Sequence, residues 1–194
     1  MTPQVRRFGP EVRFSAVRGP LTRGMVEGMP ALPMGDPGIL VSEIWPAASA
    51  EKAYSVGLVP HQSQVGDPLW KALNEATPAS ILIDLTNPDI NRTFDLFSKC
   101  EMIVSTSLHG LIFADAYGIP NVWAAYRDIH PAEAFKFYDY FSSIRRRQFR
   151  RLEILHCNRN LTAISPELID TSHFARVGEY KNRIAAAFPS HLKA

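Results

Sequence analysis

The sequence predicts an α/β fold in which a parallel sheet is flanked by helices. Short runs rich in β-branched residues alternate with segments of helical periodicity, as in consecutive βα units. The run at 81–86 is mostly apolar, which is typical of a strand buried on both faces of a parallel sheet. The length of 194 residues suits one well-cored domain, since domains usually span ~100–150 residues.

Five segments are expected to be strands. Proline cannot donate to a strand ladder, so Pro60 should end the second of them. The expected strands lie at residues 14–18, 54–60, 81–86, 102–105 and 121–125.

Helices are expected between these strands because their ends carry the usual signals. Asp67 and Pro68 form an acidic N-cap followed by proline at the first helical position, and Asn87-Pro88 uses the same device. Gly118 is expected to end a later helix. The expected helices cover residues 20–27, 68–76, 88–99, 108–117 and 131–144, followed by a terminal helical region at 166–188.

Composition and charge exclude several classes of protein. The chain has 21 Lys and Arg against 19 Asp and Glu, a formal charge of +2 that gives no global nucleic-acid signature. Its two cysteines, Cys100 and Cys157, form neither a metal-finger pattern nor a disulfide framework. No run approaches the ~20 apolar residues of a membrane span, and no signal-peptide core is present. A cytoplasmic protein is therefore expected.

The most informative segment is Ser105-Thr106-Ser107-Leu108-His109-Gly110, which joins an expected strand to an expected helix. One hydroxyl is expected to cap the helix, and the unpaired N–H groups of the first turn form an anion site. A bound phosphate would favour the protonated form of His109, which suits a general acid beside a phosphate leaving group. In the alternative interpretation, these residues only cap the helix and make structural hydrogen bonds.

Two further candidates, His61 and Arg18, lie near other strand ends, where open α/β sheets bind ligands. His61 directly follows the strand at 54–60. Arg18 and Arg23 flank a Gly-Pro turn, where a guanidinium can clamp a carboxylate or phosphate. Lys136 lies between two phenylalanines. For each residue, a structural or surface role is the simpler alternative.

Residues 145–151 carry five arginines in seven positions. Such a run can meet anionic lipid headgroups, nucleic acid or an acidic polymer, although a solvated helix end is the simpler interpretation. It has no aromatic platform beyond Phe149, and the chain contains neither a P-loop nor a G-x-G-x-x-G motif. We expect no nucleic-acid partner and treat peripheral contact with an anionic membrane as a hypothesis.

Several motifs follow one another along the chain. They are VRGPLTR at 17–23, Gly35-Asp36-Pro37, GLVPH at 57–61, STSLHGLIFADAYGIP at 105–120 and FKFYDY at 135–140. In order and spacing these motifs resemble the polysaccharide pyruvyl transferase family. The resemblance extends from about Val17 to Ser143, and the block from Ser105 to Pro120 is its most specific part.

The resemblance implies transfer of a pyruvyl group from phosphoenolpyruvate to two hydroxyls of a sugar, giving a cyclic ketal in a bacterial exopolysaccharide or cell-surface glycan. It implies a Rossmann-like fold similar to the C-terminal, donor-binding half of a GT-B-type transferase. The chain at 1–194 is then a single domain, with 1–15 as the tail of a missing N-terminal half and 145–194 as a C-terminal helical region. The acceptor would be a sugar or lipid-linked oligosaccharide, met at the inner face of the plasma membrane.

The resemblance also implies roles for individual residues. Arg18 is assigned to a donor anion, Leu108 and His109 to the donor phosphate, and His109 also to the acid. Lys136 is a second donor clamp, and His61 contacts the acceptor or acts as a base. No metal ion or cofactor is expected, since the donor is a substrate and the chain supplies the charge. The predicted catalytic residues are His109 and His61, and the predicted substrate-binding residues are Arg18, Ser107, Leu108 and Lys136.

Two other functions stay open. A GT-B-type nucleotide-sugar glycosyltransferase or epimerase has a similar Ala-Tyr-Gly-Ile-Pro segment. Those enzymes usually place a glutamate for the ribose hydroxyls five residues before the glycine, where this chain has Phe113, with Asp115 as a displaced substitute. The second alternative is a non-catalytic fragment that keeps only the donor site.

Overall fold

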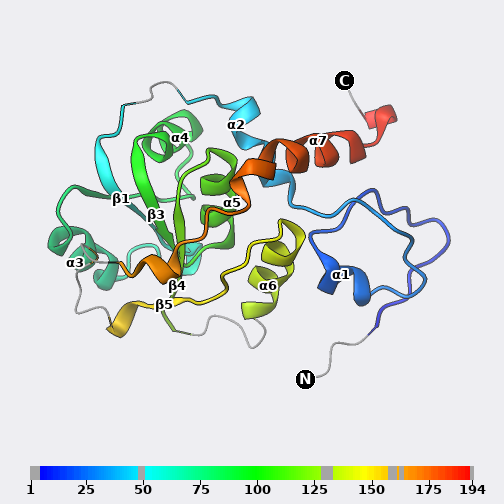
Figure 1. Ribbon diagram of the computed structural model, residues 1–194, viewed down its shortest axis with the longest axis horizontal. Helices are drawn as coiled ribbons and strands as arrows, with labels where there is room; N and C mark the ends of the chain where they lie inside the picture. Colours follow the sequence, from blue (N-terminus) through cyan, green and yellow to red (C-terminus); the bar gives the residue numbers. More distant parts are fainter. Residues whose placement is uncertain (1–4, 48–50, 128–132, 157–160, 162–163, 193–194) are drawn as a thin grey trace.

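A computed structural model describes residues 5–47, 51–127, 133–156, 161 and 164–192 (Figure 1). Five strands form one sheet in the order β2-β1-β3-β4-β5, and every neighbouring pair is parallel. The strands are β1 (Tyr54–Val59), β2 (Ser80–Leu82), β3 (Cys100–Ser105), β4 (Asn121–Ala125) and β5 (Leu152–Glu153). The predicted α/β fold with a Rossmann-like parallel sheet is confirmed.

Helices surround this sheet, and none of those described is both long and apolar enough to cross a membrane. They are α1 (Pro20–Gly24), α2 (Val41–Ile44), α3 (Pro68–Ala76), α4 (Ile90–Ser98), α5 (Leu108–Ala116), α6 (Glu133–Ser143) and α7 (Val177–Ala187). Short 3-10 helices include η1 (Pro37–Leu40), η2 (Gln62–Gln64), η3 (Ile154–His156), η4 (Pro166–Leu168), η5 (Phe174–Arg176) and η6 (Ser190–Leu192).

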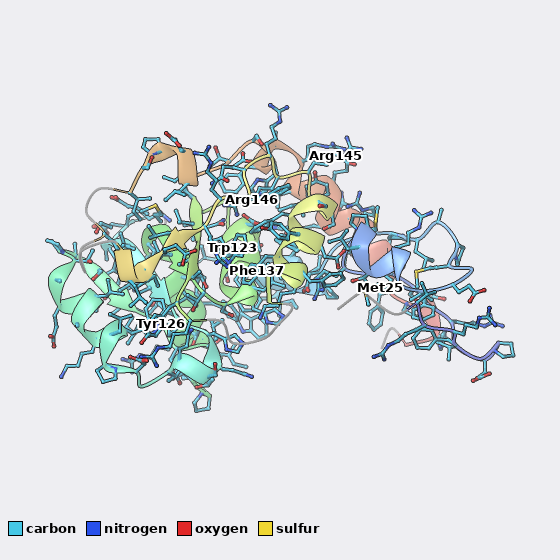
Figure 2. All side chains as sticks on the ribbon, turned by 90° about the horizontal axis from the view of Figure 1, so that it is seen from below. Met25, Trp123, Tyr126, Phe137, Arg145 and Arg146 are labelled. Atoms are coloured by element: carbon cyan, nitrogen blue, oxygen red, sulfur yellow. The ribbon has the colours of Figure 1, made fainter. Side chains whose placement is uncertain are left out.

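Both faces of the sheet are covered because alternate strand residues point to opposite sides. Leu58 and Val104 pack with Trp70 of α3 in one apolar cluster. Val59 and Ile103 point the other way, into a cluster that includes residues of α4 and α5. A third cluster joins α5 to α6 and α7, which flank it (Figure 1). Within it, Trp123 of β4 stacks on Phe137 of α6, with ring centroids 4.7 Å apart (Figure 2).

The first predicted strand is wrong. Residues 14–18 form only an isolated bridge, Val17 with Met34, because their partner is a loop and no strand of the sheet lies beside them. The segment 5–34, which contains α1, lies at one end of the molecule, beyond α6 and beside the outer part of α7 (Figure 1). Its bridge nevertheless matters for the site, since it brings Arg18 close to the loop that follows Met34.

Other element boundaries also differ from the predictions. β2 ends at Leu82 because the Asp84 carboxylate accepts hydrogen bonds from the amide and hydroxyl of Thr86, which fixes a turn. Helix α4 begins after Asp89, whose carboxylate accepts from the Arg92 amide, and not at Asn87-Pro88. The two-residue strand β5 was not predicted.

The predictions for the C-terminal part are met in part. The expected helical region at 166–188 contains η4, η5 and α7. Residues 131–132, the start of an expected helix, and Cys157 lie outside the described residues. The assignment of 1–15 to another half of a larger protein stays a prediction.

The strand order places a topological switch point between β1 and β3. The connection after β1 leads to β2 on one side, whereas the chain after β3 leads to β4 on the other. Connections that leave in opposite directions open a crevice beyond the carboxyl ends of the two strands, where open α/β sheets bind ligands.

Candidate active site

A cleft with a volume of about 440 Å³ lies at this switch point. Its size falls within the ~300–1,000 Å³ common for small-molecule sites. All six predicted site residues line it: Arg18, His61, Ser107, Leu108, His109 and Lys136. They come from the segment before α1, the end of β1, the start of α5 and the inner side of α6, so the fold unites residues that lie far apart in sequence.

Two of the three hydroxyls before α5 are bound within the fold. The Ser105 hydroxyl accepts a hydrogen bond from the Ser107 amide at 2.9 Å and lies 2.9 Å from the Val59 carbonyl. The Thr106 hydroxyl accepts from the His61 amide at 2.9 Å and donates to Gln64 at 2.6 Å. These bonds tie the ends of β1 and β3 together.

The predicted side-chain cap of α5 is wrong. Ser107 is the N-cap residue, but its hydroxyl makes no capping hydrogen bond. The first amides of a helix have no partner within the helix, and the described residues supply none for Leu108, His109 or Gly110. Three unpartnered donors and the positive end of the helix dipole therefore lie at the start of α5, where Leu108 and His109 line the cleft. This arrangement suits a bound phosphate.

Gly110 allows α5 to start so close to the sheet. A Cβ at this position would lie 2.3 Å from the Ser105 hydroxyl and 2.9 Å from the Val59 side chain. His109, one residue earlier, is exposed, and its ring stacks on Phe113 with centroids 5.8 Å apart. The helix start is thereby fixed while the imidazole remains accessible from the cleft.

Arg18 is oriented by Asp139, a fully buried residue of α6. The Asp139 carboxylate accepts from Arg18 Nε at 3.2 Å, from the amides of Leu21 and Thr22, and from the Thr22 hydroxyl. A Cβ at Gly19 would lie 2.0 Å from the Asp139 carbonyl oxygen, so α1 and α6 approach closely.

The terminal nitrogens of Arg18 make no hydrogen bond with any described residue, and its side chain is 28% exposed. The buried carboxylate therefore leaves one end of the guanidinium available to a ligand. Such a planar pair of donors matches a carboxylate or phosphate.

Lys136 and His61 complete the polar wall of the cleft. Lys136 is half-buried, with Nζ 5.4 Å from the Phe137 ring centroid. His61 Nδ1 accepts from the Ser63 amide at 3.2 Å. Since a backbone amide always donates, the neutral His61 ring carries its proton on Nε2. In that form the Nε2 of His61 is a hydrogen-bond donor. This suits the predicted contact with the acceptor sugar better than the predicted role as a base.

The cleft also contains residues that were not predicted as site residues, among them Asp36, Thr86 and Phe113. The Gly-Asp-Pro motif was the only signal that could have pointed to Asp36. The thiol of Cys100 plays no part here, because it is buried and burial raises its pKa to about 12. No cluster of three or more potential metal ligands occurs among the described residues.

Asp115, considered as a substitute for a ribose-binding glutamate, is fully buried. Its carboxylate accepts from Asn121 Nδ2 at 2.7 Å, from the Tyr140 hydroxyl at 2.9 Å and pairs with His173 Nε2 at 2.8 Å. A carboxylate committed to three partners in the core cannot reach a ligand in the cleft.

The arginines of 145–151 have separate structural roles. Arg146 is buried and donates to both the side chain and the carbonyl of Asn121, whereas Arg150 and Arg151 form ion pairs with Glu167 and Glu153. Arg145 and Arg147 are exposed. The run is thus not one uniform basic face, and membrane contact stays a prediction.

Comparison with known proteins assigns the family. The sequence model of the family described as "Polysaccharide pyruvyl transferase" matches residues 12–128, more than half of the chain. The chain belongs to the polysaccharide pyruvyl transferase family. The matched range contains every predicted site residue of this pyruvyl transferase family member except Lys136, which lies on α6.

Two known proteins are similar to this pyruvyl transferase family member. It is 30% identical over 131 residues to the succinoglycan biosynthesis protein ExoV of Rhizobium meliloti (strain 1021), covering 66% of this chain and 40% of ExoV. It is also 30% identical over 143 residues to an uncharacterized protein of Acanthamoeba polyphaga mimivirus, covering 70% and 50%. The chain thus spans about half or less of these relatives. No solved structure matches it significantly.

Proposed function

We propose that the protein acts in the transfer of a pyruvyl group from phosphoenolpyruvate to two hydroxyls of a sugar during synthesis of an exopolysaccharide or cell-surface glycan. One observation carries the proposal. The open amides of α5, the Arg18 guanidinium and Lys136 converge on a single cleft in a member of the pyruvyl transferase family.

The donor suits the charges of this cleft. Phosphoenolpyruvate carries its phosphate and its carboxylate on the same carbon atom, C2, and the cleft offers two kinds of anion site. The amides of Leu108, His109 and Gly110 would bind the phosphate. Arg18 and Lys136 would bind the carboxylate or the remaining phosphate oxygens.

The proposed chemistry needs a proton donor beside the bound phosphate. His109 protonates C3 of phosphoenolpyruvate, which leaves an oxocarbenium-like C2. One sugar hydroxyl adds to C2, the bond from C2 to the phosphate oxygen breaks, and the second hydroxyl closes the ketal. The two sugar hydroxyls lose one proton each. C3 of the donor gains one proton and the phosphate leaves with the other, so the protons balance. The donor enters as a substrate, and no cofactor is part of this scheme.

The alternative nucleotide-sugar chemistry has less support. Phe113 occupies the position where nucleotide-sugar enzymes usually have a ribose-binding glutamate. Its side chain lines the cleft but has no polar group. Asp115 is unavailable because of its buried partners. A lipid-linked acceptor and contact with the inner face of an anionic membrane remain predictions from the sequence.

Calorimetry with phosphoenolpyruvate and uridine diphosphate tests the proposal. We expect saturable heat with phosphoenolpyruvate and none with the nucleotide at the same concentration. Binding of the nucleotide without binding of phosphoenolpyruvate would support the glycosyltransferase alternative. Release of inorganic phosphate on addition of glycan fragments then distinguishes a transferase from a domain that only binds the donor.

A further inference from the structure

Two Asp-Pro pairs start helices in the same way, which allows one to be compared with the other. Asp36 accepts a hydrogen bond from the Gly38 amide at 2.9 Å, and Asp67 accepts from the Leu69 amide at 2.9 Å. Each is followed by proline at the first helical position. A cap needs one oxygen, and neutral Asn or Ser caps about as well as Asp.

The second oxygen distinguishes the two carboxylates. Asp67 Oδ2 accepts from the Tyr126 hydroxyl at 2.9 Å and lies 3.9 Å from Arg127. Asp36 Oδ2 has no hydrogen-bond partner within the described part of the chain, and Asp36 lines the cleft. The cap uses only Oδ1 of Asp36, so the second carboxylate oxygen is available to a ligand in the cleft that Asp36 lines.

The backbone holds Asp36 firmly in place. Gly35 has a φ of 150°, and its amide donates to the Val17 carbonyl at 3.0 Å. A Cβ at Gly35 would lie 2.9 Å from Ile184, so α7 packs directly against this turn. The bridge between Val17 and Met34 brings Asp36 to the same part of the cleft as Arg18.

Asp36 is the only carboxylate among the described residues that line this cleft. A carboxylate repels phosphoenolpyruvate, because both are negatively charged. Asp36 is therefore better suited to a ligand that donates hydrogen bonds. The acceptor sugar of the proposed reaction has hydroxyl groups that can donate them.

We propose that Asp36 binds the acceptor hydroxyl and takes its proton as that hydroxyl attacks the donor. This inference rests on the proposed function. The O–H bond of the first hydroxyl breaks, its proton passes to Asp36 Oδ2, and its oxygen bonds to C2 of the donor. Asp36 returns that proton to the departing phosphate. The proton of the second hydroxyl restores His109, which gave its own proton to C3.

The test compares Asp36→Asn with Asp67→Asn. Both substitutions keep an amide oxygen for the cap and remove one charge, but only the first lies in the cleft. Asp36→Ser, which also caps, is the second variant should Asp36→Asn fold poorly. Folding is checked by thermal unfolding of each variant.

Two measurements are made on each protein. Calorimetry follows the binding of phosphoenolpyruvate. Saturation-transfer NMR, with phosphoenolpyruvate present, follows contact with methyl β-D-galactopyranoside and methyl β-D-glucopyranoside, which differ only in the configuration of the hydroxyl at C4.

We expect Asp36→Asn to bind phosphoenolpyruvate as well as the unaltered chain or several-fold more tightly, and to lose most of the saturation transferred to the sugar. Asp67→Asn should keep both signals. Sugar contact unchanged in Asp36→Asn would overturn the proposal, and so would absence of sugar contact in the unaltered chain with the donor bound. Absence of phosphoenolpyruvate binding altogether would instead refute the proposed function on which the inference rests.

Discussion

Substitution of His109 by alanine is expected to weaken phosphoenolpyruvate binding about tenfold. The imidazole is exposed in the cleft beside the open amides of α5, where it can donate to the bound phosphate. Loss of a hydrogen bond to a charged group costs ~1.5–3 kcal/mol, and each 1.4 kcal/mol is about a factor of ten in affinity. Calorimetry measures the change directly.

Turnover should fall further than affinity in the same variant. If His109 is the acid that protonates C3, glycan-dependent phosphate release should decrease about 10²–10⁴-fold. His109→Gln keeps a donor for the phosphate but has no proton to give, so it should restore much of the affinity and none of the turnover. Equal loss of both in His109→Ala, with full recovery in His109→Gln, would show that His109 only binds.

Replacement of Asp115 by alanine is expected to lower the free energy of unfolding by about 3–5 kcal/mol. Its carboxylate is the common partner of Asn121, Tyr140 and His173. These residues belong to β4, α6 and the segment before α7, so one side chain connects three parts of the fold around α5. Urea denaturation measures the loss.

Tyr140→Phe is the matched control, because it removes one of these hydrogen bonds and leaves the carboxylate in place. Burial and the neighbouring Asp115 raise the pKa of the Tyr140 hydroxyl well above its usual value, so Tyr140 remains a donor. We expect a loss of about 1 kcal/mol for this variant. Equal losses for both variants would mean that Asp115 does not organise the network.

Sequence patterns predicted most of the sheet and the location of the cleft. β1, β3 and β4 have continuous apolar runs, and a parallel sheet brings their carboxyl ends to one edge. His61 and the segment from Ser105 to Gly110 directly follow two of these strands, so their convergence could be predicted. Arg18 was a candidate because it was expected to end a strand, but that strand does not form. The assignment of Arg18 and Lys136 to the donor came from family resemblance.

Tertiary contacts decided the features that were missed. The Ser105 hydroxyl bonds to the Val59 carbonyl of the neighbouring strand β1, and the Thr106 hydroxyl bonds to Gln64 of η2, so neither caps α5. From its sequence neighbours, Arg146 is expected to be one of several solvent-exposed arginines. In the fold it is buried and donates to Asn121, which is distant in sequence. Asp36 and Asp67 have the same local sequence signal, and only the surrounding fold distinguishes a purely structural cap from a carboxylate in the cleft.

Amide NMR during a titration with phosphoenolpyruvate tests most directly whether the phosphate binds at the start of α5. We expect the largest proton shifts, downfield as new hydrogen bonds form, at the backbone amides of Leu108, His109 and Gly110, with accompanying change at the Arg18 guanidinium. Saturable binding of phosphoenolpyruvate that leaves these three amide resonances unchanged would contradict this location of the donor site.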